Sequence, residues 1–200
     1  MENIKFNKIH SKGDVTINGD KISLRKFKSN DYSLFEELIK DNDYSFYFCL
    51  DGKDSDFFKN YVCGMIMQME MGLGIAFTIE TKGIFFKRKI GYIVGDYTTL
   101  RSTIGSERGL NINFAILPKY RNKGYATDAV RSLAKAYQSS PIKVFIMDIA
   151  ESNKASIKIA TKLDFLKDSR IPLFDVQHSD IGTHYKWFNA VSWIIKKNGK

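Results

Sequence analysis

The chain is poor in residues that build disulfide frameworks and metal centres. Its 200 residues include two cysteines, three histidines and three prolines. Cys49 and Cys63 are too few for a disulfide framework. A single bridge between them is the alternative to free thiols in a reducing cytoplasm, which we expect. The histidines His10, His178 and His184 are scattered, and no C-x-x-C pair accompanies them. We therefore expect no metal site.

A long apolar run is also missing. No stretch approaches the roughly 20 apolar residues that span a bilayer. The N-terminus MENIKFNKIH has no apolar core of the kind that a secretory signal carries. We therefore expect a cytoplasmic protein without a membrane partner. Hydrophobic residues make up 44% and charged residues 26%, as in globular chains, and the length suits a single domain over residues 1–200.

The charge is unevenly divided along the chain. Residues 1–100 hold 14 basic and 14 acidic residues, whereas residues 101–200 hold 17 and 8, so the whole net charge of +9 lies in the second half. Such a half favours a polyanionic partner, either a nucleic acid, a membrane surface or a phosphorylated cofactor. A solvated basic surface is the simplest alternative. Nucleic acid is disfavoured because no basic stretch is interleaved with aromatic residues and no groove-reading helix is visible.

Periodicity predicts the elements of the first half. Asn18-Gly19 between two apolar alternations predicts a hairpin whose strands lie near 14–17 and 21–25. Apolar residues recur every three or four positions over roughly 31–40 and 58–69, which predicts two helices. The aspartate-rich segment 41–56 between them predicts a solvated loop. Strands are predicted at 75–80 and 90–94.

In the second half, alternation predicts a strand at 110–117, which Pro118 ends. A helix is expected from Gly124 to about 137, then a buried strand at 142–147 and a last helix from Asn153 to about 163. Two strand candidates follow near 171–177 and 185–195. The aromatic tail, with Trp187-Phe188 and Trp193-Ile194-Ile195, suits an edge-to-edge homodimer. The whole predicts an α/β (α+β) domain with a mixed sheet.

The clearest chemical signal is the segment PKYRNKGYA at 118–126, between a strand and a helix. A glycine-containing turn at a helix start leaves several main-chain N–H groups unpaired, and the helix dipole adds partial positive charge there. Together they form an anion site suited to a diphosphate. Arg121 and Lys123 add full charges, and Gly124 permits close approach of the backbone. The alternative is a surface turn with an ordinary helix start.

Arg121, Gly124 and Ala126 match the pattern Arg/Gln-x-x-Gly-x-Gly/Ala of the GNAT superfamily of N-acetyltransferases. At this point the sequence resembles that family, particularly the branch similar to ribosomal-protein N-terminal acetyltransferases. Asn153 and Ser156, followed by KLDF at 162–165, are similar to the family's Asn-x-x-Ser/Ala and Lys-x-Gly-Phe. The resemblance is specific over about 108–166 and architectural elsewhere.

The resemblance implies a mostly antiparallel sheet, flanked by helices, in which the strands at 110–117 and 142–149 splay apart and acetyl-CoA lies in the wedge. Main-chain amides of 121–126 would hold the pyrophosphate, and backbone groups near 115–117 would pair with the pantetheine arm. Asn153 would contact the pantetheine portion, although its position equally fits a helix N-cap. The implied cofactor-binding residues are Ala115, Ile116, Leu117, Arg121, Asn122, Lys123, Gly124, Tyr125, Ala126, Asn153 and Ser156.

The chain departs from the family at the residues that move protons. Asn111 stands where relatives often carry a glutamate base, and Ala160 where many carry a tyrosine acid. The catalytic residues are therefore unassigned. Asp148 and Glu151, at and just past the end of the second splayed strand, are candidate bases acting through water, and Ser156 is a further candidate.

The resemblance implies an acetyl-CoA-dependent N-acetyltransferase, in which a primary amine attacks the thioester directly. The acceptor is open between a small-molecule amine and a protein N-terminus, and the aspartates of 41–56 would border its site. The absence of the usual glutamate and tyrosine supports an alternative, an acyl-CoA-binding sensor or interaction module on the same fold without turnover.

Overall fold

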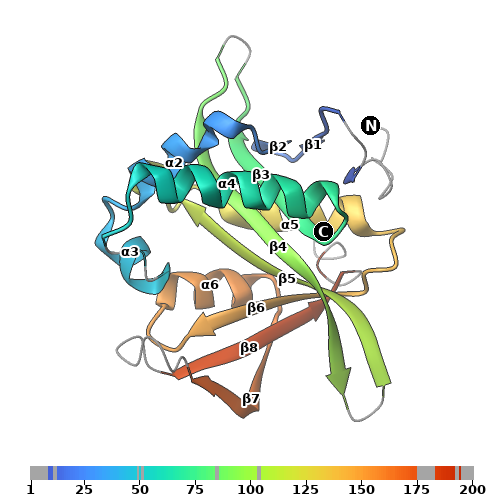
Figure 1. Ribbon diagram of the computed structural model, residues 1–200. Coiled ribbons are helices and arrows are strands. Elements are labelled where there is room, and N and C mark those ends of the chain that lie inside the picture. The colour runs from blue at the N-terminus through green and yellow to red at the C-terminus, as the bar shows by residue number, and fades with distance from the viewer. Residues whose placement is uncertain are drawn as a thin grey trace.

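The computed structural model describes residues 9–10, 13–48, 50, 52–83, 86–102, 105–174, 183–191 and 194. Within these residues the strands form one eight-stranded sheet in the order β1-β2-β3-β4-β5-β6-β8-β7 (Figure 1). The elements in chain order are β1 (Thr16–Asn18), β2 (Ile22–Lys26), η1 (Ser29–Asp31), α2 (Tyr32–Leu38), α3 (Asn42–Phe48), α4 (Ser55–Glu70), β3 (Gly74–Thr81), β4 (Lys89–Ser102), β5 (Gly105–Ile116), η2 (Pro118–Tyr120), α5 (Tyr125–Tyr137), β6 (Val144–Ala150), α6 (Lys154–Lys162), β7 (Leu166–Phe174) and β8 (Thr183–Ala190).

Neighbouring strands pair antiparallel throughout the described sheet except at β5 and β6, which are parallel. This confirms the mixed, mostly antiparallel sheet flanked by helices, and the hairpin at Asn18-Gly19. β4 and β5 are longer than the strands predicted at 90–94 and 110–117, because their pairing continues to Ser102 and Gly105. The extension was missed because residues such as Thr98 and Arg108 are exposed and carry no apolar alternation.

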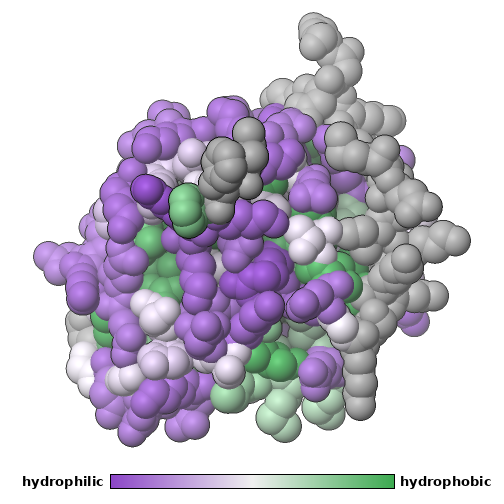
Figure 2. All heavy atoms as spheres, turned by 90° about the horizontal axis from the view of Figure 1, so that it is seen from above, coloured by the Kyte–Doolittle hydropathy of each residue, from purple (hydrophilic) through white to green (hydrophobic). Residues whose placement is uncertain are grey.

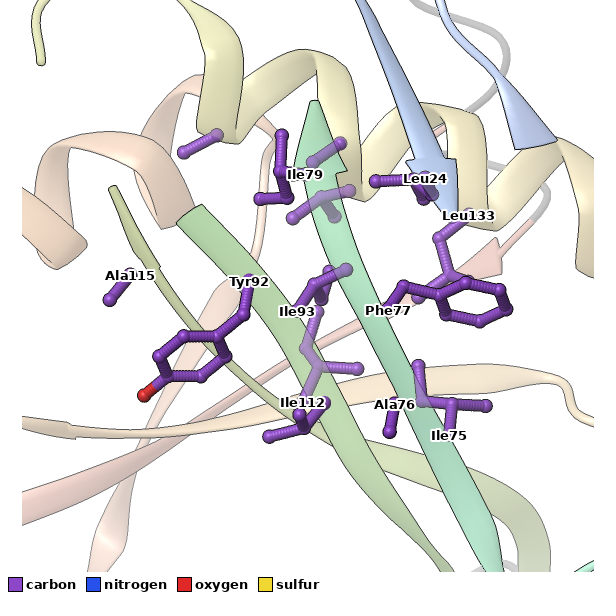
Figure 3. Packing of buried hydrophobic residues seen from close by; sticks show 14 of the residues in the cluster. Leu24, Ile75, Ala76, Phe77, Ile79, Tyr92, Ile93, Ile112, Ala115 and Leu133 are labelled. Atoms are coloured by element: carbon purple, nitrogen blue, oxygen red, sulfur yellow. The ribbon is translucent and has the colours of Figure 1, made fainter. Parts of the chain in front are cut away.

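Helices cover both faces of the sheet. On one face, Phe77 of β3 and Ile93 of β4 belong to the same buried cluster as Leu133 of α5, and Figure 3 shows Phe77 next to Leu133. On the other face, Tyr92 of β4 stacks on Phe35 of α2 with ring centroids 4.8 Å apart. Seen from above, the surface is mostly polar, with apolar side chains exposed in small areas (Figure 2). The core therefore lies in two layers, one on each side of the central strands.

The aspartate-rich segment 41–56 is not the solvated loop that its composition predicts. Helix α3 forms within it. Tyr44 is buried, its ring packs 4.8 Å from that of Phe48, and its hydroxyl lies 3.0 Å from the Tyr92 hydroxyl. Asp54 is the N-cap of α4 and accepts the Phe57 N–H at 2.8 Å. Burial of the Tyr44 side chain against the sheet outweighs the weak local preference of this aspartate-rich segment for a loop.

The tail differs from expectation in register and in position. β7 begins at Leu166 rather than near 171, and β8 ends at Ala190 rather than at 195. β8 pairs with β6 on one side and with β7 on the other. The main chain of Trp187 therefore lies inside the sheet and offers no edge, while the homodimer itself stays a prediction. Residues 175–177, 193 and 195, together with Cys49 and His178, fall outside the described residues.

Asp128 ties helix α5 to the first hairpin. Its buried carboxylate accepts the main-chain N–H groups of Asp20 at 3.1 Å, Lys21 at 2.7 Å and Ile22 at 3.1 Å. The turn approaches so closely that a Cβ at Gly19 would lie 2.4 Å from the Ser132 hydroxyl oxygen. This contact fixes the hairpin beside the N-terminal end of α5, where the anion site was predicted.

Substituting Asp128→Ala is expected to lower the free energy of unfolding by about 2 kcal/mol, because three main-chain N–H groups lose a charged acceptor. Urea denaturation measures the effect. Asp20→Ala is the matched control, since it removes an exposed carboxylate from the same turn and leaves the N–H in place. Equal midpoints for the two variants would contradict the anchoring role.

Candidate active site between two diverging strands

A gap opens between β5 and β6. Their parallel pairing covers only Gly109–Asn111 of β5 and Val144–Ile146 of β6. Beyond these residues β5 runs on to Ile116 and β6 to Ala150 without further pairing between them (Figure 1). The splayed strands that the resemblance implied are therefore present.

Main-chain groups of β5 face this gap. The Leu117 N–H donates to the Ile90 carbonyl at 2.8 Å, toward β4. Hydrogen-bonded and non-bonded positions alternate along antiparallel strands, so the main chain of Ala115 also turns toward β4, while Phe114 and Ile116 turn toward the gap. Of the three residues expected to meet pantetheine, Ile116 is the one whose main chain is so placed. Phe114 was not expected.

A cavity of about 500 Å³ occupies the gap and its mouth. It is bordered by β5, the loop after η2, the start of α5, and helices α3 and α6. Two of the predicted cofactor-binding residues, Leu117 and Lys123, do not line it. The remaining nine line it together: Ala115, Ile116, Arg121, Asn122, Gly124, Tyr125, Ala126, Asn153 and Ser156.

The loop between η2 and α5 presents a row of free main-chain donors. Asn122 and Gly124 adopt left-handed backbone angles, with φ of 61° and 81°. The Arg121 N–H donates to the Pro118 carbonyl, and the first intrahelical bond of α5 runs from the Asp128 N–H to the Gly124 carbonyl. The intervening N–H groups, 122–127, have no acceptor among the described residues, and α5 has no side-chain cap. This is the geometry of an anion site at a helix N-terminus.

The charged side chains of this loop hold it in place. Arg121 donates from Nε to the Ile116 carbonyl at 2.9 Å and pairs through Nη2 with the Asp41 carboxylate. The Lys123 carbonyl accepts the Lys21 ammonium at 3.1 Å. Arg121 was expected to add charge beside a diphosphate, and its guanidinium instead links the loop to β5 and to the segment before α3. The donors for an anion are therefore main-chain groups.

Two lysines and a helix that the sequence did not point to complete the cavity. Lys158 and Lys162 of α6 line it four residues apart, and neither ammonium has a partner among the described residues. Helix α3 contributes Tyr47 and Phe48. The spacing of the lysines could have predicted that both side chains lie on one face of α6, because positions i and i+4 share a helix face. The aromatic wall was not predictable, since α3 itself was missed.

A buried tyrosine pair lies behind the cavity wall. The hydroxyls of Tyr44, which lines the cavity, and Tyr92 are 3.0 Å apart. Burial raises the pKa of Tyr44 above its usual value, and burial together with the neighbouring tyrosines raises the pKa of Tyr92 well above its usual value. Both hydroxyls are therefore neutral at physiological pH and act as hydrogen-bond donors or acceptors.

Asn153 is the N-cap of α6. Its Oδ1 accepts the Ser156 N–H at 3.0 Å, so the N-cap alternative is confirmed. Its side chain also borders a second cavity of about 80 Å³ that continues the gap between β5 and β6. Ser156 lines both cavities. The carboxamide nitrogen of Asn153 is left for a ligand, because the oxygen is engaged.

The two candidate carboxylates occupy different places. Asp148 lines the smaller cavity and accepts a hydrogen bond from Asn111 Nδ2 at 2.9 Å. Glu151 is exposed, lies 3.4 Å from the Lys167 ammonium and lines neither cavity. The structure thus brings Asp148 to the gap and leaves Glu151 outside it.

In the described part of the chain, none of the helices combines the length and apolar character needed to cross a membrane. No group of three or more His, Cys, Asp or Glu side chains there is arranged to hold a metal ion. Cys63 is exposed as a free thiol.

Comparison with known proteins gives one family. A model of the acetyltransferase (GNAT) domain matches residues 21–166. No curated protein matches the sequence. Among solved structures, an acetyltransferase of the GNAT family from Bacillus anthracis superposes with a TM-score of 0.69 at 18% identity, covering 89% of this chain and 99% of that one.

Two further structures have the same fold. RimL, a ribosomal L7/L12 alpha-N-protein acetyltransferase, has a TM-score of 0.70 at 14% identity over 88% of this chain and 94% of its own. The microcin C7 self-immunity acetyltransferase MccE, solved with acetyl-CoA and AMP, has a TM-score of 0.70 at 14% identity over 92% and 99%. Identities this low show a shared fold alone.

Proposed function

The chain belongs to the GNAT acetyltransferase family and is therefore an acyltransferase, and from this premise we propose that it moves the acetyl group of acetyl-CoA to a primary amine by direct attack. The observation that carries the proposal is the row of unpartnered N–H groups at 122–127, which opens into a cavity between two diverging strands. The relatives RimL and MccE have been solved with coenzyme A and acetyl-CoA, which supports the choice of co-substrate.

The residues of the cavity fit acetyl-CoA. The diphosphate matches the N–H groups of 122–127, where the left-handed Gly124 lets the main chain approach closely. The amides of the pantetheine arm match the free main-chain groups of Phe114, the Ile116 N–H and the Asn153 carboxamide nitrogen, whereas the Ile116 carbonyl already accepts from Arg121. Lys158 and Lys162 supply the positive charge that an anionic ligand requires. These lysines are part of the excess positive charge of the second half of the sequence.

When bound, acetyl-CoA supplies a thioester carbonyl as the electrophile. The protein positions this carbonyl in the gap and surrounds it with strand main chain, so that an N–H of β5 would polarise it. Holding amine and thioester together in one cavity lowers the entropic cost of their meeting. No residue of the chain needs to carry the acetyl group.

The acceptor remains a proposal at the level of chemical class. A small-molecule amine and a protein N-terminus both fit direct attack, and RimL is a relative that acts on a protein N-terminus. A cytoplasmic location, without membrane or nucleic-acid partners, stays a prediction from composition.

Binding of acetyl-CoA is expected to raise the melting temperature, since a ligand at 100 times its Kd stabilises the folded state by about 2.7 kcal/mol. S-acetylpantetheine, which lacks the diphosphate, should raise it much less. Thiol release is then measured with four amines: a decapeptide with a free N-terminal serine, spermidine, kanamycin and methionine amide. No thermal shift and no thiol would contradict the proposal. A shift without turnover of any amine would instead favour the sensor alternative.

A further inference from the structure

Asp148 lines the smaller of the two cavities of the gap. It follows the last paired residue of β6, Ile146, by two positions, at the point where β5 and β6 part. The smaller cavity that it lines shares Tyr47, Phe114 and Ser156 with the larger one. A group bound beside Asp148 is therefore continuous with the space assigned to the thioester.

The carboxylate faces the side of the sheet opposite α5. Phe145 of β6 contacts Tyr137 of α5, with ring centroids 6.0 Å apart, so odd-numbered residues of β6 face α5. Side chains alternate along a strand, and Asp148 therefore points to the other face, as does its partner Asn111. The smaller cavity, which Asp148 lines, is also lined by Tyr47 and Phe48 of α3.

Asn111 holds Asp148 in place. Its Nδ2 donates to Asp148 Oδ2 at 2.9 Å, while Asp148 Oδ1 lies 3.7 Å from the Lys186 ammonium of β8. A carboxylate offers about four lone-pair positions, so both oxygens can still accept from an ammonium group. The Asn111 Oδ1 is itself buried without a partner among the described residues. A buried acceptor without a partner lowers the stability of the fold. A purely structural role for Asn111 does not explain this cost.

The other carboxylates near the gap are less well placed. Asp43 of α3 lines only the larger cavity, and Glu151 lines neither. The charged and titratable neighbours nearest to Asp148 are Lys186 of β8 and, in the same cavity, Tyr47 of α3. On the neighbouring strands, Asp168 lies opposite Lys186 and Asp96 lies opposite Asn111.

We infer that Asp148 accepts the proton of the acceptor ammonium and that Asn111 is its positioning residue. Asp148 takes one proton from R–NH3⁺ and leaves a neutral amine. The nitrogen lone pair then bonds to the acetyl carbon, the carbon–sulfur bond breaks, and a second proton of the nitrogen ends on the sulfur as a free thiol. The carboxylate base of this chain thus lies on β6. Asn111, the amide that orients it, occupies the position on β5 where relatives often carry a glutamate base. This inference rests on the proposed acetyl transfer.

The test compares Asp148→Asn, Asn111→Ala, Glu151→Gln and Asp168→Asn at saturating acetyl-CoA, with the best amine of the four-member panel. Asp148→Asn should lower kcat about 100-fold to 1000-fold at pH 7, the usual loss for a general base. Asn111→Ala should lower it about tenfold. Both losses should shrink as the pH rises, because solvent then supplies the neutral amine. Asp168→Asn, which removes a carboxylate from the same face outside both cavities, should keep the wild-type rate.

Melting temperature and acetyl-CoA affinity should stay at wild-type values in Asp148→Asn, which separates lost chemistry from lost folding. If that variant is unstable, Asn111→Ala with its pH profile decides the matter alone. An Asp148→Asn rate within threefold of wild type, a pH-independent loss, or a larger loss in Glu151→Gln would overturn the inference while acetyl transfer stands. No thiol release by the wild type with any amine would overturn both.

Discussion

Replacing Asp31 by alanine is expected to lower the free energy of unfolding by about 3 to 5 kcal/mol, the range for breaking a buried charge network. The Asp31 side chain is fully buried and accepts five hydrogen bonds. Its donors are Arg25 through Nη1 at 3.0 Å and Nη2 at 3.1 Å, Lys89 at 2.8 Å, the Lys28 N–H at 2.8 Å and the Thr78 hydroxyl at 2.7 Å. One carboxylate thus joins β2, β3, β4 and η1, and its loss leaves Arg25 with Glu80 as its remaining carboxylate and Lys89 with the Asn30 carbonyl. Urea denaturation at pH 7 measures the effect.

The same carboxylate makes the stability depend on pH. Burial raises the pKa of Asp31, but hydrogen bonds from Arg25, Lys89, Lys28 and Thr78 together outweigh it and lower the pKa from 3.8 to about 2. The folded pKa lies below the unfolded one, so this contribution is complete above about pH 4 and is lost as the pH falls through 2. A shift of this size is worth about 2 kcal/mol.

The difference in unfolding free energy between wild type and Asp31→Asn should therefore shrink between pH 4 and pH 2. Asp56→Asn is the control, because Asp56 pairs with Lys59 at an exposed position where solvent screens the interaction. Its midpoint should equal that of the wild type. An Asp31→Asn midpoint equally close to wild type at pH 7 would show that the network does not stabilise the fold.

Asn122→Asp is expected to weaken acetyl-CoA binding about 30-fold at low salt. Asn122 lines the cavity within the row of free N–H groups and has a left-handed backbone that aspartate also tolerates. The substitution therefore changes charge without changing shape or fold. One negative charge about 6 Å from another, at an effective dielectric constant near 25, costs about 2 kcal/mol, which is about 30-fold in Kd.

Isothermal titration with acetyl-CoA measures the affinity at two salt concentrations, and the loss should be smaller at high salt because the repulsion is screened. Asn60→Asp on the exposed surface of α4 adds the same charge away from the cavity and should leave the Kd unchanged. Equal affinities for the two variants would place the diphosphate elsewhere on the molecule.

The parts of the fold that follow from local pattern were predictable. The Asn18-Gly19 hairpin, α4 and α5 each carry a turn signal or an apolar stripe that acts within a few residues. Two features depend on partners that are distant in sequence. Helix α3 forms because Tyr44 packs on Tyr92, and β8 enters the sheet between β6 and β7. No local sequence pattern predicts either arrangement.

The candidate site divides in the same way. The N–H row was predictable because a glycine-containing turn before a helix produces it from backbone geometry alone. The use of the Arg121 side chain was not, because its partners, Ile116 and Asp41, come from two other segments. From the sequence, Asp148 was one of two candidate carboxylates, the other being Glu151. Choosing Asp148 over Glu151 required the structure, because only the structure shows where β5 and β6 separate.

The position of β8 has a consequence for synthesis on the ribosome. β7 leaves the ribosome before β8, but β8 is the strand with which β7 pairs. β8 also pairs with β6. Until β8 has left the exit tunnel, β7 therefore has no neighbour in the described sheet, and one side of β6 stays open. Exposed strand edges are prone to wrong pairing, so the nascent chain is most vulnerable in the interval between these two strands.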